Sequence, residues 1–226
     1  MSAPATTGAY LLDLPGLTPY SEALSLMANM AGARSQQAIP DTLILLEHDP
    51  VVTLGTRTDV AQELPHPALL EQRGIPVVEV ARGGRATYHG PGQLVGYPIL
   101  DLAPLGRDLR RYVELLEAAL IGALAELGVA AEARAGEEHT GVWVEDRKIA
   151  SIGVHVASWI STHGFALNVD CDLEPFDLFV GCGLQDSRYT TAASEAGRPI
   201  GRAEATAAVL THLGQQLGHT WEALPA

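Results

Sequence analysis

Residues 141–169, GVWVEDRKIASIGVHVASWISTHGFALNV, decide the fold class of this chain. Three segments within them, 141–144, 149–156 and 164–169, alternate apolar with small or polar residues. Alternating segments that are separated by only a few residues are typical of antiparallel strands joined by tight turns. The stretch therefore predicts a three-stranded antiparallel meander, with turns at Glu145-Asp146 and near Ser161-Thr162.

The segments on either side of the meander alternate between strand and helix patterns. Apolar or β-branched runs bounded by Pro, Gly or Asp predict strands over 10–14, 43–48, 51–54, 75–80 and 94–102. Helical spacing predicts helices that begin at Thr18-Pro19, over 68–73, from Asp108 to Leu127, and over 203–217. This order indicates an α+β fold: a single domain, residues 1–226, with a mixed, largely antiparallel sheet packed by helices.

Composition narrows the function classes. Hydrophobic residues make up 47% of the chain and charged residues 18%, a profile typical of a globular protein with its own core. The formal net charge of −13 argues against a broad nucleic-acid-binding face. Because no apolar run approaches the roughly 18 residues of a membrane span and no signal-peptide pattern opens the chain, we expect a cytoplasmic protein without a membrane partner.

The densest unusual segment is the loop from Arg82 to Gln93, RGGRATYHGPGQ. Its glycines let backbone N–H groups approach a ligand closely, while two arginines and a histidine supply charge and hydrogen bonds. The glycine spacing matches neither a phosphate-binding P-loop nor a dinucleotide fingerprint. Two interpretations remain: a binding loop, or a turn-rich connection with solvated arginines.

Lys148 is the only lysine in a chain that has 13 arginines. Arginine stays charged under nearly all conditions, whereas an amine can change its pKa or pass on a proton. A site that needs such an amine therefore cannot accept arginine. Lys148 falls at the start of a predicted strand, so a plain lysine beside a hairpin turn is the alternative interpretation.

The two cysteines, Cys171 and Cys182, are not spaced as a CxxC pair, which predicts free thiols. Cys182 lies between two glycines, a sterically open position that suits a nucleophile. Cys171 lies between two aspartates, which would raise the pKa of its thiol and make it the poorer nucleophile. His155 and His163 lie near both cysteines in sequence, but no compact pair of ligands supports zinc, and we expect no metal.

Together these segments resemble the lipoyl(octanoyl) transferase family, the octanoyl-[acyl carrier protein]:protein N-octanoyltransferases. The resemblance is strongest over residues 42–195. Its signatures, in order, are the Arg82–Gln93 loop, the strand pair 141–153 with RKIAS at 147–151, the stretch 163–168, and the pair Cys182-Gly183. The resemblance implies a fold like the catalytic domains of biotin and lipoate protein ligases. One position departs from the family: Gly181 stands where proline is usual, which loosens the backbone before the cysteine.

The resemblance also implies a site. Cys182 would carry the acyl group, and Lys148 would lower the pKa of its thiol. The substrate pocket would be formed by three segments, whose residues are Arg82, Gly83, Gly84, Arg85, Ala86, Thr87, Tyr88, His89, Ser151, Ile152, Gly153, Gly164, Phe165 and Ala166. No cofactor is implied, because the acyl donor is carried on the phosphopantetheine of acyl carrier protein. The implied partners are octanoyl-acyl carrier protein, the lipoyl domains of 2-oxoacid dehydrogenase complexes, and the glycine cleavage H protein.

In such an enzyme the Cys182 thiolate attacks the octanoyl thioester, and the ε-amine of a lysine on a lipoyl-accepting domain then takes the acyl group from Cys182. Lys148 could accept the proton that the incoming amine loses. Because both protein partners are expected to be acidic, Arg82 and Arg85 would belong to a docking patch. Three further arginines, Arg107, Arg110 and Arg111, would either join that patch or form an ordinary solvated helix start.

Three other functions remain open at this point. An ATP-dependent lipoate or biotin protein ligase would share the fold and would not need Cys182. A non-catalytic module could bind acylated carrier proteins. A cysteine hydrolase could use His89 or His163 as its base.

Overall fold

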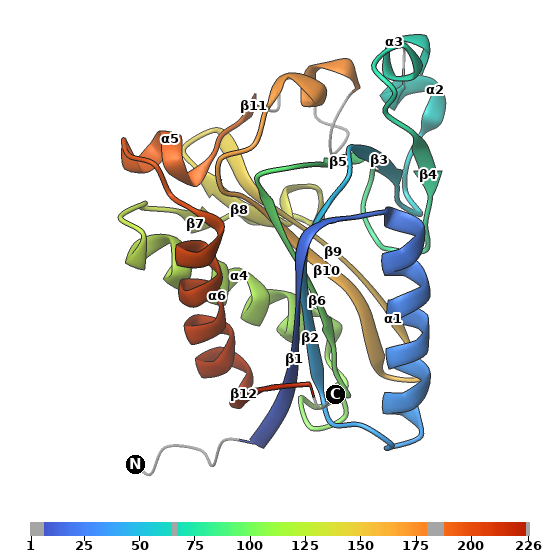
Figure 1. The fold of residues 1–226 in the computed structure, drawn as a ribbon, viewed down its shortest axis with the longest axis vertical. Helices are drawn as coiled ribbons and strands as arrows, with labels where there is room; N and C mark the ends of the chain where they lie inside the picture. Colours follow the sequence, from blue (N-terminus) through green and yellow to red (C-terminus); the bar gives the residue numbers. More distant parts are fainter. Residues whose placement is uncertain (1–6, 65–66, 180–187, 225–226) are drawn as a thin grey trace.

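The computed structural model describes residues 7–64, 67–179 and 188–224, which form two sheets flanked by helices (Figure 1). The larger sheet runs in the order β12-β1-β2-β6-β10-β9-β8-β7, and β11 pairs with β9 beside this path. Its strands are β1 (Thr7–Thr18), β2 (Thr42–His48), β6 (Gln93–Ile99), β7 (Glu132–Ala133), β8 (Gly141–Val144), β9 (Arg147–Ala157), β10 (Ile160–Asn168), β11 (Arg188–Tyr189) and β12 (His219–Ala223). The pairings β12–β1, β1–β2 and β11–β9 are parallel, and the others described in this sheet are antiparallel. The predicted α+β class with a mixed, largely antiparallel sheet is confirmed.

A smaller sheet of order β4-β3-β5 lies beside the carboxyl end of β2. Its strands are β3 (Val51–Leu54), β4 (Val77–Glu79) and β5 (Thr87–His89), and the short helices α2 (Val60–Glu63) and α3 (Pro67–Gln72) connect β3 to β4. Leu54, Leu70 and Ile75 belong to its separate hydrophobic core, which also takes in Phe176 and Phe179 from the 3₁₀ helix η2 (Glu174–Leu178) and the residue that follows it. This core ties the segment before residue 180 to the smaller sheet.

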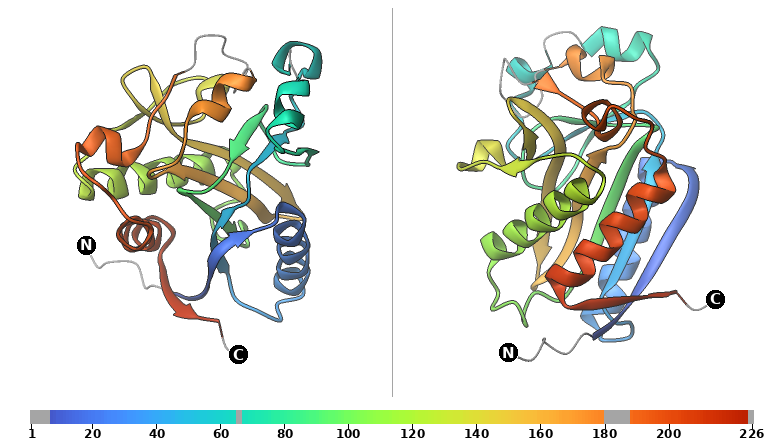
Figure 2. Two further views of the ribbon diagram at one scale, coloured as in Figure 1. Left: turned by 45° about the horizontal axis from the view of Figure 1, so that its top comes forward. Right: turned by 90° about the vertical axis from the view of Figure 1, so that its left-hand side faces the viewer.

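Helices cover both faces of the larger sheet (Figure 2). On one face α4 (Leu109–Glu126) packs against α6 (Arg202–Leu217) over the main core. On the other face α1 (Tyr20–Ser35) packs against β6 and β10. The predicted helix from Asp108 is well defined because the Asp108 side chain accepts a hydrogen bond from the N–H of Arg111 at 3.0 Å and so caps the first turn. The remaining short elements are η1 (Glu137–His139) and α5 (Ala192–Ala196).

The meander at 141–169 is confirmed, with one correction. The first turn lies at Glu145-Asp146 as predicted, but the second lies at Ser158-Trp159, not near Ser161-Thr162. Ser158 and Trp159 have φ values of 50° and 66°, the paired positive angles that suit a tight hairpin. Neither residue is one of the usual signals for such a turn, so the sequence pattern missed it. The correction makes β9 and β10 long continuous strands.

The edge strand β12, which lies beside β1, was not predicted from the sequence. After α6, Gly218 ends the helix in a left-handed conformation, and the chain then runs parallel to β1 as β12. Strand β1 is longer than the predicted 10–14 because it pairs on both sides. Within the part of the chain that the structure describes, no helix has both the length and the apolar composition to cross a bilayer.

Candidate active site

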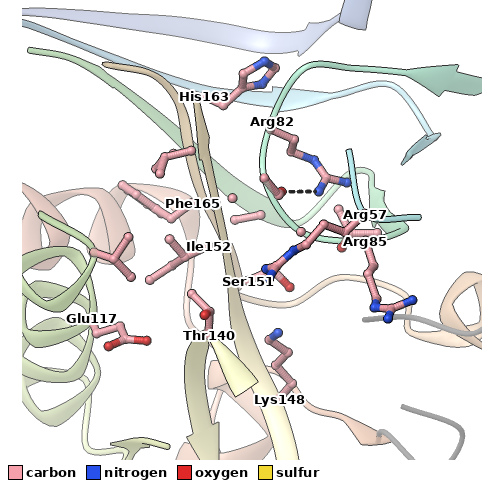
Figure 3. Close-up of a pocket in the computed structure, with 18 of the residues that line it drawn as sticks. Arg57, Arg82, Arg85, Glu117, Thr140, Lys148, Ser151, Ile152, His163 and Phe165 are labelled. Carbon is pink, nitrogen blue, oxygen red and sulfur yellow. Dashed lines mark hydrogen bonds between the residues drawn. The ribbon is translucent and has the colours of Figure 1, made fainter. Parts of the chain in front are cut away.

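A cavity of about 920 Å³ opens between α4, the middle of β9 and β10, and the loop that precedes β5 (Figure 3). This volume is in the range of small-molecule binding sites. The three segments that the sequence singled out meet here. Fourteen of the predicted residues line the cavity: Arg82, Gly83, Gly84, Arg85, Ala86, Thr87, His89, Lys148, Ser151, Ile152, Gly153, Gly164, Phe165 and Ala166.

Tyr88 is described by the structure but is not among the residues that line the cavity. The side chain of Tyr88 belongs to the core of the smaller sheet, where its ring packs edge-on against Phe176 at 5.5 Å between centroids. Successive side chains of a strand point to opposite faces, so Tyr88 turns away where Thr87 and His89 turn toward the cavity. Cys182 lies outside the described residues, as does Gly181.

Lys148 reaches the cavity from β9 although it is only 2% exposed. Its Nζ lies 5.2 Å from the centroid of the Trp143 ring, a cation–π contact that holds the ammonium. The β8–β9 register shifts beside it, with Val142 opposite Ala150 but Trp143 opposite Lys148. Such a bulge re-aims the side chains around it, and it lies where the lysine enters the cavity. The sequence placed Lys148 beside a turn but could not show that it is buried.

Lys148 also lies beside the strand that follows residue 187. Tyr189 of β11 pairs with Lys148 in parallel register, and the N–H of Thr190 donates to the Lys148 carbonyl at 3.1 Å. The Tyr189 ring stacks on Phe176 at 3.9 Å between centroids. Both described ends of the segment that contains Cys182 are therefore held at this corner of the cavity.

The loop from Arg82 to Ala86 is built around two buried charges. Arg82 is 6% exposed, and its guanidinium donates to the carbonyl and the hydroxyl of Thr53 at 2.8 and 2.7 Å. The carboxylate of Glu63 is 1% exposed and accepts hydrogen bonds from Arg85 at 2.7 Å and from the N–H of Ala86 at 3.0 Å. Gly83 donates its N–H to the Val154 carbonyl at 2.9 Å. These contacts dock the loop onto β9, which shows it to be an ordered wall of the cavity.

The opposite end of the cavity carries uncharged rings. His163 and His89 line it together with Tyr20 and Tyr97. Burial lowers the pKa of His163 to about 4 and that of His89 well below its usual value, and the nearby charge of Arg82 acts in the same direction. Burial likewise raises the pKa of Tyr20 to about 12. At neutral pH this end is polar but neutral, apart from Arg82.

Several lining residues escaped the sequence analysis. The first turns of α4 contribute Leu109, Val113 and Glu117. Leu109 is apolar but 46% exposed. Glu117 accepts a hydrogen bond from the N–H of Gly141 at 3.0 Å, and burial raises the pKa of its carboxyl group. The missing signal was which side of α4 faces the cavity, since Tyr112 in the same turns is fully buried in the main core.

Cys171 is a buried thiol away from this cavity lining. Burial raises its pKa to about 12, and the charges of Asp172 and Asp170 add to that effect. A thiol with such a pKa is inert at neutral pH. Among the described residues, no three histidine, cysteine, aspartate or glutamate side chains gather as metal ligands would.

Comparison with known proteins places this geometry in a family. Residues 19–214 match the lipoyl protein ligase A/B catalytic domain. The octanoyltransferase of Geobacter sulfurreducens is 49% identical over 199 residues, which cover 88% of this chain and 80% of that protein. The same fold occurs in a crystal structure of lipoate-protein ligase A bound with ATP, with a TM-score of 0.79 and 19% identity over 96% of this chain and 89% of that one.

A more distant likeness is to the biotin protein ligase of Aquifex aeolicus, with a TM-score of 0.55 and 13% identity over 94% of this chain and 69% of that chain. The expected likeness to biotin and lipoate ligases is thus confirmed for the fold. The identity to Geobacter octanoyltransferase over most of both sequences separates the relatives of this chain from those structural neighbours. The chain belongs to the lipoyl protein ligase A/B catalytic domain family, and its curated relatives there are octanoyltransferases.

Proposed function

We propose that this protein is an acyltransferase that moves an octanoyl group from acyl carrier protein to the lysine ε-amine of lipoyl-accepting domains, through an acyl thioester on Cys182. The relatives that share 41–49% of its sequence over most of the chain carry the name octanoyltransferase. The acceptors would be the lipoyl domains of 2-oxoacid dehydrogenase complexes and the glycine cleavage H protein. No cofactor is needed, because the donor arrives on the phosphopantetheine of its carrier.

One observation carries the proposal: the only lysine of the chain is buried in the cavity wall and is paired with the strand that follows Cys182. Cys182 precedes Tyr189 by seven positions (189 − 182) and lies outside the described residues. An ammonium close to a thiol favours the thiolate, which is the nucleophilic form. The acyl chain would lie in the part of this cavity that is lined by Ile152, Phe165 and Ala166.

The reaction balances in two steps. The Cys182 thiolate attacks the octanoyl thioester, the carrier thiolate leaves, and one thioester replaces another. The acceptor amine then attacks the acyl-enzyme, an amide forms, and the Cys182 thiolate is released. The amine must lose a proton in this second step, and a Lys148 side chain that gave its own proton to the leaving carrier thiolate in the first step could accept it, which arginine could not do. Conversion of thioester to amide drives the sequence forward.

The cavity is suited to select the acyl chain by length. Each methylene buried there contributes about 0.8 kcal/mol, so two carbons more or fewer change binding by about 1.6 kcal/mol. Because the opposite end is lined by buried polar rings rather than by apolar side chains, a longer chain would place its extra methylenes against polar groups and would gain less from their burial. We expect an optimum of chain length, not a steady increase.

Intact-mass spectrometry tests the covalent step. The protein is mixed with octanoyl-acyl carrier protein in the absence of acceptor, and we expect a single added octanoyl group that Cys182→Ser abolishes and Cys171→Ser leaves unchanged. A wild-type protein that never acquires the adduct under conditions of turnover would refute the acyl-cysteine mechanism.

An ATP-dependent ligase is the alternative function to test for this protein, because lipoate-protein ligase A has the same fold. The same protein incubated with octanoate, ATP and a lipoyl domain should modify the domain no faster than a blank. Full activity of Cys182→Ser under those conditions would favour a ligase. Release of free octanoate without an acceptor would favour a hydrolase.

A further inference from the structure

A continuous chain of buried hydrogen bonds crosses the sheet from the cavity to the backbone of Lys148. His89 lies 2.8 Å from the Gln93 side-chain oxygen, Gln93 lies 2.9 Å from the Asn168 side-chain oxygen, and Asn168 lies 3.1 Å from the Thr190 carbonyl. The N–H of Thr190 then reaches the Lys148 carbonyl at 3.1 Å. All five residues are at most 6% exposed. None of these hydrogen bonds was predicted from the sequence.

Each bond in this chain has a fixed direction. The Asn168 amide nitrogen donates to the Thr190 carbonyl, so the Asn168 oxygen is the acceptor for the Gln93 amide nitrogen. The Gln93 oxygen is then left to accept from Nδ1 of His89. Nδ1 therefore carries the proton of this imidazole, whose Nε2 is left as an acceptor. Replacing Asn168 by a residue without an amide removes the side-chain donor from the Thr190 carbonyl and leaves the Gln93 amide nitrogen with only the Tyr88 carbonyl, at 3.3 Å, as acceptor.

Asn168 occupies the central position in this chain. It is the last residue of β10, opposite Gln93 of β6, and its side chain extends to the residue that follows β11. Strand β11 is only two residues long and pairs with β9 alone among the described strands. Such a short parallel pair has little stability of its own. Its attachment to β9 therefore depends on side-chain contacts: the Tyr189 ring stacks on Phe176, and Thr190 is held from two sides.

A second tie holds Thr190 from the outer side. The carboxylate of Glu195 accepts from the Thr190 hydroxyl at 2.5 Å and from Arg147, the neighbour of Lys148, at 2.9 Å. That carboxylate is part of a surface ion pair, since Arg147 is 32% exposed in its side chain. Asn168 is 3% exposed, so water cannot replace its bond to Thr190. Solvent therefore cannot compensate for loss of the hydrogen bond between Asn168 and Thr190.

We propose that Asn168 is a positioning residue for the transfer reaction: it holds β11 against β9 and so fixes Lys148 and the entry of the chain into β11 relative to each other. Asn168 is not among the residues that line the cavity. This inference rests on the proposed function, because it assigns Asn168 an effect that is exerted through Lys148. It also explains why a buried amide, and not an apolar residue, ends a strand in which Phe165, Ala166 and Leu167 are core residues.

The test compares two buried polar residues of the same strand. Asn168→Leu removes the hydrogen bond to Thr190 and keeps the number and branching of the side-chain heavy atoms. Ser161→Ala is the control, because the Ser161 hydroxyl is 0% exposed and bonds the Pro98 carbonyl at 2.7 Å, at the other end of β10. Two quantities are measured for each folded variant: kcat and KM for octanoyl transfer, and the rate of iodoacetamide alkylation of the Cys182 peptide as a function of pH.

We expect Asn168→Leu to lower kcat about tenfold or more with little change in KM for the donor, since loss of a buried hydrogen bond is of that order. The pH midpoint of Cys182 alkylation should rise in Asn168→Leu and stay unchanged in Ser161→Ala, even where both variants lose similar thermal stability. In a Lys148→Ala background, Asn168→Leu should cause no additional shift, because both changes act through the same amine. If Asn168→Leu does not fold, Asn168→Ser makes the same comparison without a bulky apolar side chain.

The outcomes separate the two proposals. An unchanged alkylation profile in Asn168→Leu, beside a shifted one in Lys148→Ala, would overturn the role of Asn168 and leave the proposed function intact. A shift of equal size in the presence and absence of Lys148 would also overturn it. An unchanged profile in Lys148→Ala itself would mean that the lysine does not activate Cys182, and both proposals would fall at that step.

Discussion

Gly141→Ala is the substitution whose effect on the site can be worked out most fully. Gly141 begins β8 with φ at 131°, a conformation that residues with a side chain rarely adopt. A Cβ atom there would lie 2.4 Å from the Ala150 carbonyl oxygen and 2.7 Å from Cε of Lys148. The alanine therefore meets both the partner strand and the lysine stem.

Two terms set the loss of stability. The unfavourable φ costs about 1–3 kcal/mol, and overpacking against backbone costs about 1–3 kcal/mol more. We expect a decrease in the free energy of unfolding of about 3 kcal/mol, which corresponds to a Tm lower by roughly 10 °C in a chain of this length. To restore an ordinary contact of 3.4 Å, Cε of Lys148 must also move by about 0.7 Å (3.4 − 2.7). Misplacement of a reacting group by about 1 Å costs up to roughly 100-fold in rate.

Gly128→Ala is the matched control. Gly128 has a φ of 88°, and a Cβ atom there would meet nothing within 4 Å. It therefore carries the conformational cost without the contact, at the end of α4 and not beside the lysine. Thermal unfolding and octanoyl transfer are measured for both variants at a temperature where each is folded.

We expect Gly128→Ala to lose stability but keep full transfer activity, while Gly141→Ala loses about tenfold or more in kcat. If the two variants lost similar stability and Gly141→Ala transferred octanoyl groups at the wild-type rate, the packed position of Lys148 would not matter for the reaction. The reasoning that links its burial to its role would then be refuted.

Three further outcomes follow from the buried titratable groups. Burial lowers the pKa values of His48 and His163 to about 4, against about 6.5 in the unfolded chain. Between these two pH values the unfolded state binds more protons than the folded state. The free energy of unfolding should therefore fall as pH drops from 6.5 to 4, by up to about 3 kcal/mol for each histidine. NMR titration midpoints near 6.5 for both rings would contradict this. Burial alone would raise the pKa of Asp41, but its hydrogen bonds to His219 and Arg34 outweigh that effect and lower the pKa. Its contribution to the free energy of unfolding is therefore present near neutral pH and is lost in acid. Urea unfolding should show Asp41→Asn to be less stable than the wild type at pH 7 by an amount that shrinks toward pH 3, and a stability loss independent of pH would count against this origin. Cys171, with its pKa raised to about 12, should resist iodoacetamide at pH 8 in the folded protein, and rapid labelling of the Cys171 peptide would show that the thiol is not sealed off.

Local patterns in the sequence predicted most of the elements because each pattern reports on its own segment. The helix from Asp108 is an example: its cap, its apolar spacing and Gly128 at its end all lie within the helix or next to it. The turn at Ser158-Trp159 was missed because its backbone angles are imposed by the two strands it joins and not by its own residues. Strand β12 was missed for a related reason, since only pairing with β1 makes that segment a strand.

In the candidate site, too, local patterns identified some residues and missed those that only tertiary contacts bring to the cavity. Sequence features were enough to identify the Arg82 loop, Lys148, Ser151 and Gly164. Glycines, a single lysine and the order of these segments can all be read from the amino-acid sequence. Tyr20 and Tyr97 could not, because nothing in their own segments distinguishes a ring that lines a cavity from a ring in the core. Tyr88 was included because it lies in the loop motif, and strand alternation turns it the other way.

The sequence by itself determined the α+β class and the family, and it predicts Cys182 and Lys148 as the pair suited to acyl transfer, because periodicity and residue chemistry are properties of the chain. Only the tertiary structure decided that Lys148 is buried beside Trp143, that β11 returns to pair with it, and that Asn168 joins the two across the sheet. Those contacts join residues far apart in the chain. Their geometry is set by strand pairing, a bulge and buried hydrogen bonds, none of which leaves a periodic signal in the sequence.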